Sequence, residues 1–226
     1  MTTAHIAFDD VSYVVDDAPI LRGVTTRLTA SRTAVIGANG SGKSTFARMI
    51  NGLRQPTSGS VRVLGLDPAA DAARVRSRVG FVFTNPEAQI LMPTPAEDLA
   101  LSLGSLSRAM RTLRAEQILE QYGLAGRGDQ PVSELSGGQR QLLALAAVLC
   151  TDPRLVVADE PTTLLDLRNA RRIADLLLTL PVPVVIVTHD LELAARCDAA
   201  VLFDGGRLVE TGEPPAVIET YRRISA

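Results

Sequence analysis

The sequence is poor in features that define several common classes of protein. Only two cysteines are present among 226 residues, Cys150 and Cys197, and neither lies in a CxxC pair or a histidine-rich segment. This pattern indicates that the two cysteines are small apolar residues of the core and form neither a disulfide nor a metal site. The longest apolar runs, residues 142–150 and 182–187, are much shorter than the roughly 20 residues of a membrane-spanning helix, so we expect no segment that crosses a bilayer.

A basic cluster is also missing. The 23 lysines and arginines are interspersed with 25 aspartates and glutamates, for a net charge of −2. This pattern argues against a nucleic-acid partner and against a polybasic membrane anchor. The first ten residues, MTTAHIAFDD, have neither a basic flank nor an apolar run. We therefore expect no signal peptide and a chain that stays in the cytoplasm.

The length fits one large domain, or one domain with a modest insertion, and the apolar content of 46% is sufficient for a buried core. A helix is expected over residues 43–53, where apolar residues recur at helical spacing. Short segments of β type, bounded by polar turns, lie at residues 6–15, 24–29, 33–36, 60–64 and 79–83.

From Pro86 to about Cys150 the pattern becomes helical and poor in strands. We interpret this segment as a helical subdomain within a single domain of residues 1–226. Continuous apolar strands then return at residues 155–158 and 182–187, with a crossover helix at 167–180 between them, as in a parallel sheet buried on both faces. The sequence therefore predicts an α/β fold with a parallel core. A hairpin and a short helix close the chain, at residues 199–203, 207–210 and from 215 onward.

A glycine-rich stretch reading Gly-Ala-Asn-Gly-Ser-Gly-Lys-Ser joins the strand at 33–36 to the helix after it. A phosphate-binding loop requires this context, without which a glycine-rich turn would be the simpler interpretation. Backbone N–H groups turn inward toward an anion, the helix points its positive end at the phosphates, and Lys43 adds a mobile charge. The loop predicts binding of ATP with Mg²⁺, and Ser44 is a candidate metal ligand. The candidate nucleotide ligands are Gly37, Asn39, Gly40, Ser41, Gly42, Lys43, Ser44 and Thr45.

Two carboxylates, Asp159 and Glu160, directly follow the apolar strand at 155–158. Ligands bind at the carboxyl ends of parallel strands, where these side chains would project. Asp159 would hold Mg²⁺, directly or through water, and Glu160 would orient and deprotonate an attacking water. An arbitrary pair of this kind is more often a solvated strand end. The phosphate loop upstream favours the catalytic interpretation.

Between these two motifs the sequence reads Leu-Ser-Gly-Gly-Gln at residues 135–139, which matches the signature of ABC ATPases. His189 matches the family's switch histidine, and residues 163–166 resemble its D-loop. The chain thus resembles the ABC ATPase family over nearly its whole length. The resemblance implies a P-loop NTPase of the ABC type, with a parallel core, an N-terminal antiparallel β subdomain and a helical subdomain.

The resemblance also implies a pair of chains. In the family, two ATP molecules are held between two subunits, and each signature faces the γ-phosphate bound by the opposite chain. The second anion-binding surface predicted here is formed by Ser136, Gly137, Gly138 and Gln139 at a helix start. Lys43, Glu160 and His189 would be the catalytic residues of the facing chain. Both halves are present, so a homodimer is expected and a heterodimer with a related subunit is the alternative.

Two positions depart from the family's pattern. Thr84 stands where a glutamine usually contacts Mg²⁺ and faces the membrane partner; its hydroxyl could join through a bridging water, and Gln89 is a second candidate for that role. Val15 stands where an aromatic ring usually stacks on adenine. Tyr13 lies on the same side of an alternating strand, either as a substitute or as a core residue. The lack of an aromatic ring at Val15 predicts weaker discrimination for adenine.

Residues 80–98 resemble importers of the energy-coupling-factor class. Within that class the chain, with threonine at position 84, is most similar to the ATPase of biotin importers. The ATPase of cobalt or nickel importers is the alternative. The resemblance implies a peripheral position at the cytoplasmic face of the membrane. It also implies three partners, namely a second ATPase subunit, an integral membrane coupling protein that docks near residues 84–98, and a membrane solute-binding protein.

Two other functions remain for comparison. A soluble ABC ATPase acting in DNA repair or on the ribosome would need a long coiled-coil insertion or a second ATPase domain, for which the chain has no room. A non-catalytic regulatory subunit would be expected to lack Glu160, His189 or Ser136, and all three are present. The transport ATPase is therefore the favoured interpretation.

Overall fold

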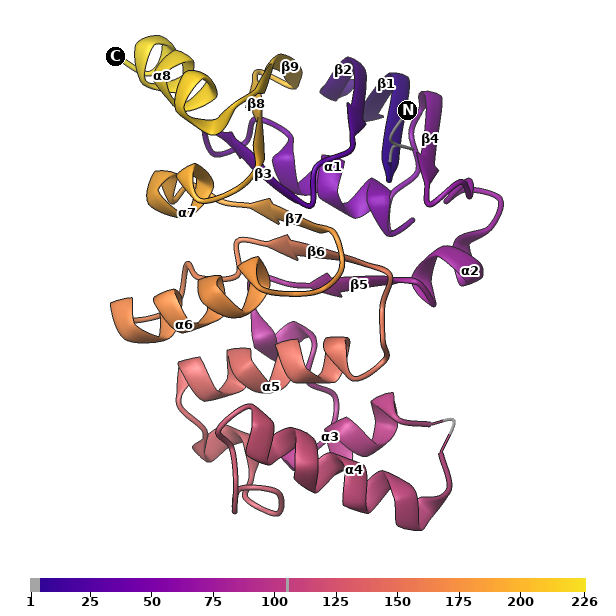
Figure 1. Cartoon of the computed structure of the whole chain (residues 1–226). Coiled ribbons are helices and arrows are strands. Elements are labelled where there is room, and N and C mark those ends of the chain that lie inside the picture. Colours follow the sequence, from indigo (N-terminus) through magenta and orange to yellow (C-terminus); the bar gives the residue numbers. More distant parts are fainter. Residues whose placement is uncertain (1–4, 105) are drawn as a thin grey trace.

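The computed structural model describes residues 5–104 and 106–226, and its strands form two sheets (Figure 1). The smaller sheet is antiparallel, with strand order β2-β1-β4. The larger sheet has the order β5-β6-β7-β3-β8-β9; its first five strands are parallel, and β9 is antiparallel to β8. The strands are β1 (Ile6–Val15), β2 (Ala18–Leu28), β3 (Arg32–Gly37), β4 (Ser58–Val63), β5 (Val79–Val82), β6 (Leu155–Asp159), β7 (Val184–Val187), β8 (Ala199–Asp204) and β9 (Arg207–Gly212).

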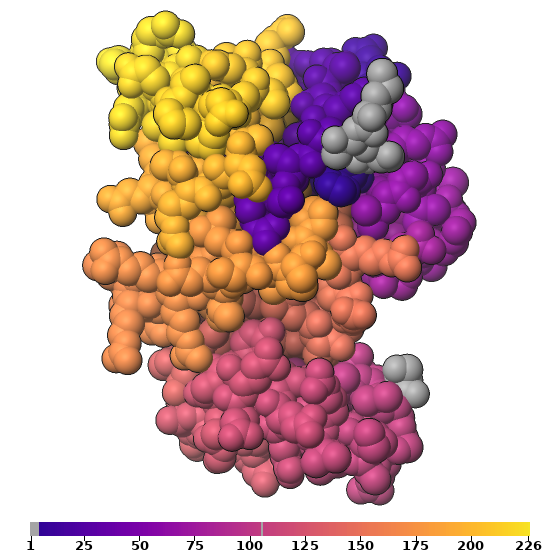
Figure 2. Space-filling model, in the orientation of Figure 1, coloured from indigo at the N-terminus to yellow at the C-terminus, as the bar shows by residue number. Residues whose placement is uncertain are grey.

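Helices cover both faces of the larger sheet. Helix α1 lies between the two sheets, whereas α3, α4 and α5 form a helical part at the bottom of Figure 1, in which α5 also packs on the larger sheet; α3 and α4 lie in the lower lobe in Figure 2. The α-helices are α1 (Lys43–Ile50), α2 (Ala72–Arg76), α3 (Pro95–Ser102), α4 (Arg108–Gln121), α5 (Gly137–Leu149), α6 (Leu167–Leu178), α7 (Leu191–Ala195) and α8 (Pro214–Ile224), and the short 3-10 helices are η1 (Pro86–Ala88) and η2 (Val132–Glu134).

Alternating residues of the central strands enter two separate cores. In β6, Leu155 and Val157 pack with α1 and the small sheet, whereas Val156 and Ala158 pack with the helices on the other face. This alternation places α1 on one face of the parallel sheet and α5 on the other. Strands buried on both faces explain the continuous apolar runs in the sequence.

Phe46 fixes the position of α1 between the sheets. Its ring centroid lies 4.3 Å from that of Phe8 in β1 and 5.0 Å from that of Phe203 in β8. Aromatic pairs at such distances add to the stabilisation from burial alone. The helix that follows the glycine-rich loop is therefore anchored from both sheets, and the loop starts from a rigid base.

The predicted α/β class with a parallel core is confirmed, and the differences lie at element ends. The helix expected over residues 43–53 ends at Ile50, because Gly52 adopts a left-handed φ of 72°. The strand expected from residue 182 begins at Val184, since Pro181 and Pro183 have no N–H to donate. Strand β2 starts at residue 18, whereas the sequence predicted a start at residue 24. The prediction began too late because Pro19 and Gly23 are unfavourable in strands and weaken the sequence pattern there.

Candidate functional site

The glycine-rich loop, residues 37–44, leaves the carboxyl end of β3 and enters α1. Two of its glycines have no room for a side chain. A Cβ at Gly37 would lie 2.1 Å from the carbonyl oxygen of Phe203, and one at Gly42 would lie 2.7 Å from Leu21 Cδ2. Both residues also have left-handed φ values, 142° and 100°. The loop is thus held tightly against β8 and β2, with Asn39 and Gly40 exposed.

Lys43 occupies the first turn of α1 and is only 6% exposed. Its Nζ donates hydrogen bonds to the carbonyl oxygens of Gly37, at 2.8 Å, and Ala38, at 2.9 Å. Burial lowers the pKa of the amine, and the nearby carboxylates of Glu160 and Asp159 act against this shift. The ammonium therefore lies within the loop, where phosphate oxygens could replace the two carbonyls as its partners.

Asp159 ends β6 beside the loop and is 1% exposed. Its Oδ1 accepts a hydrogen bond of 2.9 Å from Ser44 Oγ, and its Oδ2 lies 3.8 Å from Arg48 Nη2. Burial raises the pKa of the Asp159 carboxyl, while the Ser44 hydroxyl and the Arg48 guanidinium act in the opposite direction. A buried carboxylate of this kind is stabilised by a cation.

The donor set fits Mg²⁺. One carboxylate oxygen and one hydroxyl oxygen are hard ligands, and Mg²⁺ bound with a nucleotide usually takes one or two protein ligands, phosphate oxygens and water. Within residues 5–104 and 106–226, no group of three or more His, Cys, Asp or Glu side chains could hold a metal ion. A Mg²⁺ ion held by Ser44 and Asp159 would therefore take its remaining ligands from phosphate and water.

Glu160 continues from Asp159 with a left-handed φ of 51°, which is uncommon for a residue with a side chain. Its N–H donates to the carbonyl oxygen of Val187 in β7, at 2.9 Å. Its Oε2 accepts a hydrogen bond of 2.9 Å from Thr163 Oγ1 and lies 2.8 Å from His189 Nδ1. A backbone conformation of this kind costs about 1–3 kcal/mol and is typical of functional sites. Glu160 and His189 thus meet at the ends of neighbouring strands.

Ser136 and Gln139 form a capping box at the start of α5. Gln139 N donates to Ser136 Oγ at 3.3 Å, and Ser136 N donates to Gln139 Oε1 at 2.8 Å. Helix starts with free N–H groups and a positive dipole end attract anions. Helix α5 packs on the opposite face of the parallel sheet from α1, so this helix start is separate from the one that follows the glycine-rich loop.

Thr84 follows β5, and its Oγ1 donates to the main-chain carbonyl oxygen of Asp159 at 2.8 Å. The hydroxyl is therefore hydrogen-bonded to the main chain at the end of β6. The hypothesis that Gln89 replaces the absent glutamine is wrong for this structure. Gln89 Oε1 accepts from Phe83 N at 3.1 Å, and its Nε2 donates to the carbonyl oxygen of Ala144 in α5 at 3.2 Å. Gln89 thus connects β5 to α5 and does not face Asp159.

Tyr13 is half-buried and packs against the core beneath the small sheet, whereas Val15 is 41% exposed. Irregular pairing on both sides of Tyr13 interrupts the alternation of β1. The expectation that residues 13 and 15 share one side of a regular strand is therefore wrong, and Tyr13 is a core residue.

Sequence reasoning missed Arg48 and Asn169, and it placed Thr163 in the D-loop without foreseeing its contact with Glu160. Arg48, Thr163 and Asn169 contact Asp159, Glu160 and Asp166, respectively. Thr163 and Asn169 each follow their carboxylate by three residues, a spacing that signals a local hydrogen bond. Arg48 gave no signal, because its contact joins α1 to β6 across 111 positions of the sequence.

Comparison with known proteins agrees with this geometry. The model of the ABC transporter family matches residues 21–163. The chain belongs to this family, as an ATP-binding domain with the fold of its ATPases.

Relatives with known names narrow the comparison. A Bartonella quintana protein, named only as an ABC transporter ATP-binding protein, is 46% identical over 97% of this chain and 99% of its own length. The biotin transport ATP-binding protein BioM of Rhizobium etli is 40% identical over 98% of this chain and 100% of its own. The resemblance drawn from the sequence motifs is confirmed by these relatives.

Solved structures agree on the fold. The structure of cbiO1 from Clostridium perfringens, part of the ABC transporter complex cbiONQ, has a TM-score of 0.84 and 26% identity, and covers 98% of this chain and 93% of that one. A second ATP-binding cassette, described as a dimer in a post-hydrolysis state bound to ADP and Pi, has a TM-score of 0.82 and 26% identity over 92% of this chain and 98% of its own. Among the helices that the structure describes here, none is long and apolar enough to cross a membrane.

Proposed function

We propose that this chain hydrolyses ATP to power an importer of the energy-coupling-factor class, and that the imported solute is biotin. The observation that carries the solute assignment is the relationship to the biotin transport ATP-binding protein of Rhizobium etli, 40% identical over the full length of that protein. An importer of cobalt or nickel is the second candidate. The cbiO1 structure shares the fold at a lower identity of 26%, so biotin is preferred.

The proposed nucleotide site is the loop of residues 37–45 with the ends of β6 and β7. The loop N–H groups and Lys43 would hold the phosphates, and Ser44 and Asp159 would ligate Mg²⁺, which would neutralise phosphate charge. Glu160 would take the proton of a water that attacks the γ-phosphorus, with ADP as the leaving group. The contact between Glu160 Oε2 and His189 Nδ1 supports a shared role, with His189 orienting the carboxylate and contacting the γ-phosphate.

A second copy of the chain would complete this site. The start of α5, residues 136–139, would be an anion-binding surface, and α5 packs on the other face of the parallel sheet from α1. In the proposed arrangement the two surfaces of one chain would contact different ATP molecules, and two chains facing each other head to tail would close two equivalent sites. We propose a homodimer, with a heterodimer of two related subunits as the alternative.

The membrane partner would dock in a groove between the core and the helical part. The groove has a volume of about 320 Å³ and is lined by residues of both parts, among them Asn51, Val79, Phe81, Leu91, Asp98 and Leu101. Leu91 and Leu101 are 72% and 53% exposed, which suits an apolar helix of a coupling protein.

In this assembly the chain is one ABC ATPase domain of residues 1–226, with a helical subdomain at about 86–150. It would lie at the cytoplasmic face of the membrane, held by the coupling protein, and a separate membrane-embedded protein would bind the solute. Closure of the ATPase dimer on ATP and its opening after hydrolysis would move the coupling protein, because ATP binds the closed state more tightly.

The experiment that tests the proposal is uptake by the chain assembled with its membrane partners. Labelled biotin should accumulate, and Glu160→Gln in the ATPase should abolish accumulation without loss of assembly. Uptake of cobalt or nickel instead of biotin would overturn the solute assignment. Equal ATPase rates for wild type and Glu160→Gln would overturn the catalytic assignment.

The docking groove has its own test. Leu101→Asp should prevent co-purification with the coupling protein, because a charge would then face an apolar helix. Val209→Asp is the matched control, since Val209 is similarly exposed, at 46%, but lies on β9 at the far edge of the sheet. Co-purification that survives Leu101→Asp would place the coupling protein elsewhere.

A further inference from the structure

The start of α5 packs closely against the start of α6. A Cβ at Gly138 would lie 2.5 Å from Cγ and 2.6 Å from Nδ2 of Asn169, closer than real Cβ contacts allow. Gly138 is not among the residues with a left-handed φ, so its backbone would accept alanine. Room for the Asn169 side chain, and not backbone conformation, therefore requires glycine at this position.

Asn169 is not free to move aside. Its backbone N–H donates to Asp166 Oδ1 at 2.9 Å, and its Nδ2 donates to Asp166 Oδ2 at 2.6 Å. These hydrogen bonds are the main cause of a lowered pKa at Asp166, which also caps α6. The Asp166 carboxylate thus holds the Asn169 amide in the position where it meets Gly138.

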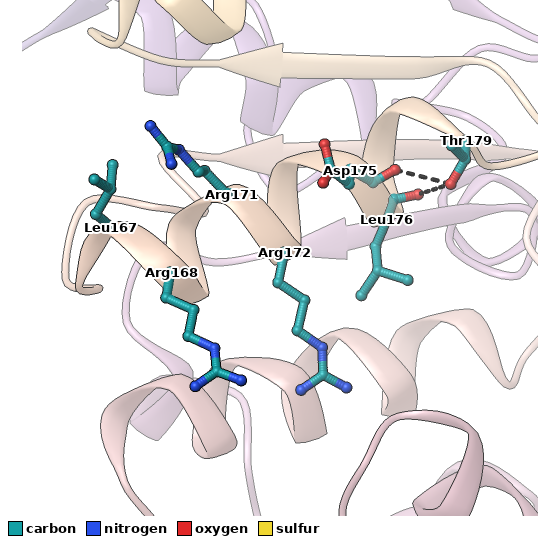
Figure 3. Close-up of a pocket in the computed structure, with 7 residues that line it drawn as sticks. All are labelled: Leu167, Arg168, Arg171, Arg172, Asp175, Leu176 and Thr179. Carbon is teal, nitrogen blue, oxygen red and sulfur yellow. Dashed lines mark hydrogen bonds between the residues drawn. The ribbon is translucent and has the colours of Figure 1, made fainter.

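Helix α6 touches the helical part at a second point. Arg172 Nη2 donates to the carbonyl oxygen of Tyr122 at 2.8 Å, and a Cβ at Gly123 would lie 2.6 Å from the same nitrogen. Figure 3 shows the Arg172 side chain leaving α6 on the side that faces the helices below. Helix α6 thus contacts the helical part through Asn169 in its first turn and through Arg172 one turn later. Two such contacts restrict the orientation of the helical part more than one would.

We infer that Asn169 is a positioning residue that sets the place of the α5 start, and with it Ser136 and Gly138, relative to the parallel core of the same chain. The inference rests on the proposed function, in which residues 136–139 contact the nucleotide of a second copy. Asn169 lies three residues after Asp166 and is held by its carboxylate, so a movement of residues 163–166 would reach the α5 start through the contact of Asn169 with Gly138.

The test is a compensating pair of substitutions in a Glu160→Gln background, with ATP-driven dimerisation measured by analytical ultracentrifugation. Gly138→Ala should displace the α5 start and weaken dimerisation by at least about tenfold, because misplacements near 1 Å can cost about a hundredfold in reactivity. Asn169→Ala should restore room for the new methyl group. The double variant Gly138→Ala with Asn169→Ala should then dimerise within about threefold of Asn169→Ala alone.

A second measurement separates positioning from loss of folding. Binding of a fluorescent ATP analogue to the single chain depends on the Lys43 loop and should be the same in all four variants, and each variant should keep a single cooperative unfolding transition. A double variant that dimerises as poorly as Gly138→Ala would overturn the inference, since glycine would then be needed for contact with the nucleotide itself. A Glu160→Gln chain that does not dimerise with ATP at all would instead overturn the proposed two-chain site.

Discussion

The hydroxyl of Thr84 donates a hydrogen bond of 2.8 Å to the carbonyl oxygen of Asp159, and so joins the ends of β5 and β6 beside the proposed metal site. Thr84→Val removes this bond while keeping the shape of the side chain. We expect a loss of about 1 kcal/mol in the free energy of unfolding, which corresponds to a fall of about 2–4 °C in Tm for a chain of this size. Thr84→Ser retains the hydroxyl and is the control.

The same variant tests the role of residue 84 toward the metal. Since the Thr84 hydroxyl is already directed at a main-chain oxygen, the Mg²⁺ concentration for half-maximal ATPase activity should be unchanged in Thr84→Val. A large rise in that concentration, with Thr84→Ser normal, would show that the hydroxyl supports the metal after all.

Thr163 shares Glu160 Oε2 with His189. Thr163→Val removes one hydrogen bond to the carboxylate but leaves the proposed base and the histidine in place. We expect kcat to fall by less than about tenfold, against a loss of at least about a hundredfold for Glu160→Gln. Steady-state ATPase assays with Thr163→Ser as control measure both effects. A loss as large as that of Glu160→Gln would assign Thr163 a direct part in the reaction.

Burial lowers the pKa of Lys43, so its amine loses its charge at a lower pH than a solvated lysine does. Affinity for ATP should therefore weaken on alkalinisation before the ordinary lysine pKa of about 10.4 is reached. Titration with a fluorescent ATP analogue between neutral pH and pH 10 measures this. Lys43→Arg keeps its charge throughout and should give a flat profile, even if its affinity is lower. Parallel profiles for both proteins would assign the pH dependence to another group.

Burial raises the pKa of Cys150 to about 11 and that of Cys197 to about 12. Only the thiolate is reactive, so at pH 8 fewer than roughly one thiol in a thousand is ionised. Both cysteines should resist thiol reagents in the folded chain, become more reactive as pH rises, and react quickly in denaturant. A thiol titration in buffer and in guanidinium chloride makes the comparison. Rapid modification of the native chain at neutral pH would contradict this.

Val15 is exposed at the tip of β1, where the sequence lacks an aromatic residue. If a base stacks there, Val15→Tyr should tighten ATP binding by about fivefold or more, because stacking of a base on an aromatic ring contributes about 1–3 kcal/mol. The wild-type chain should prefer ATP over GTP only weakly. Binding of inorganic triphosphate is the control and should not change. An unaltered ATP affinity in Val15→Tyr would place the base elsewhere.

The sequence was sufficient for the parts of the site that local motifs define. Lys43, Asp159 and His189 each follow a strand that is legible from its apolar run, and the fold brings strand ends to one edge. The contacts between elements that are distant in the sequence could not be predicted from it. The partner of Thr84 depends on the pairing of β5 with β6, and the partner of Gly138 depends on how α5 meets α6. Neither leaves a periodic pattern in the chain.

Lys43, whose ammonium closes the glycine-rich loop, is the only lysine in the chain. Every other basic side chain is an arginine or a histidine, and the amino terminus is the one further amine. Acylating dyes, aldehyde cross-linkers and lysine-modifying enzymes therefore have a single side chain to act on, and it lies at the proposed phosphate site. Labelling of the Lys43 amine, counted apart from the amino terminus, would thus report empty sites, and attachment through Lys43 would inactivate the protein.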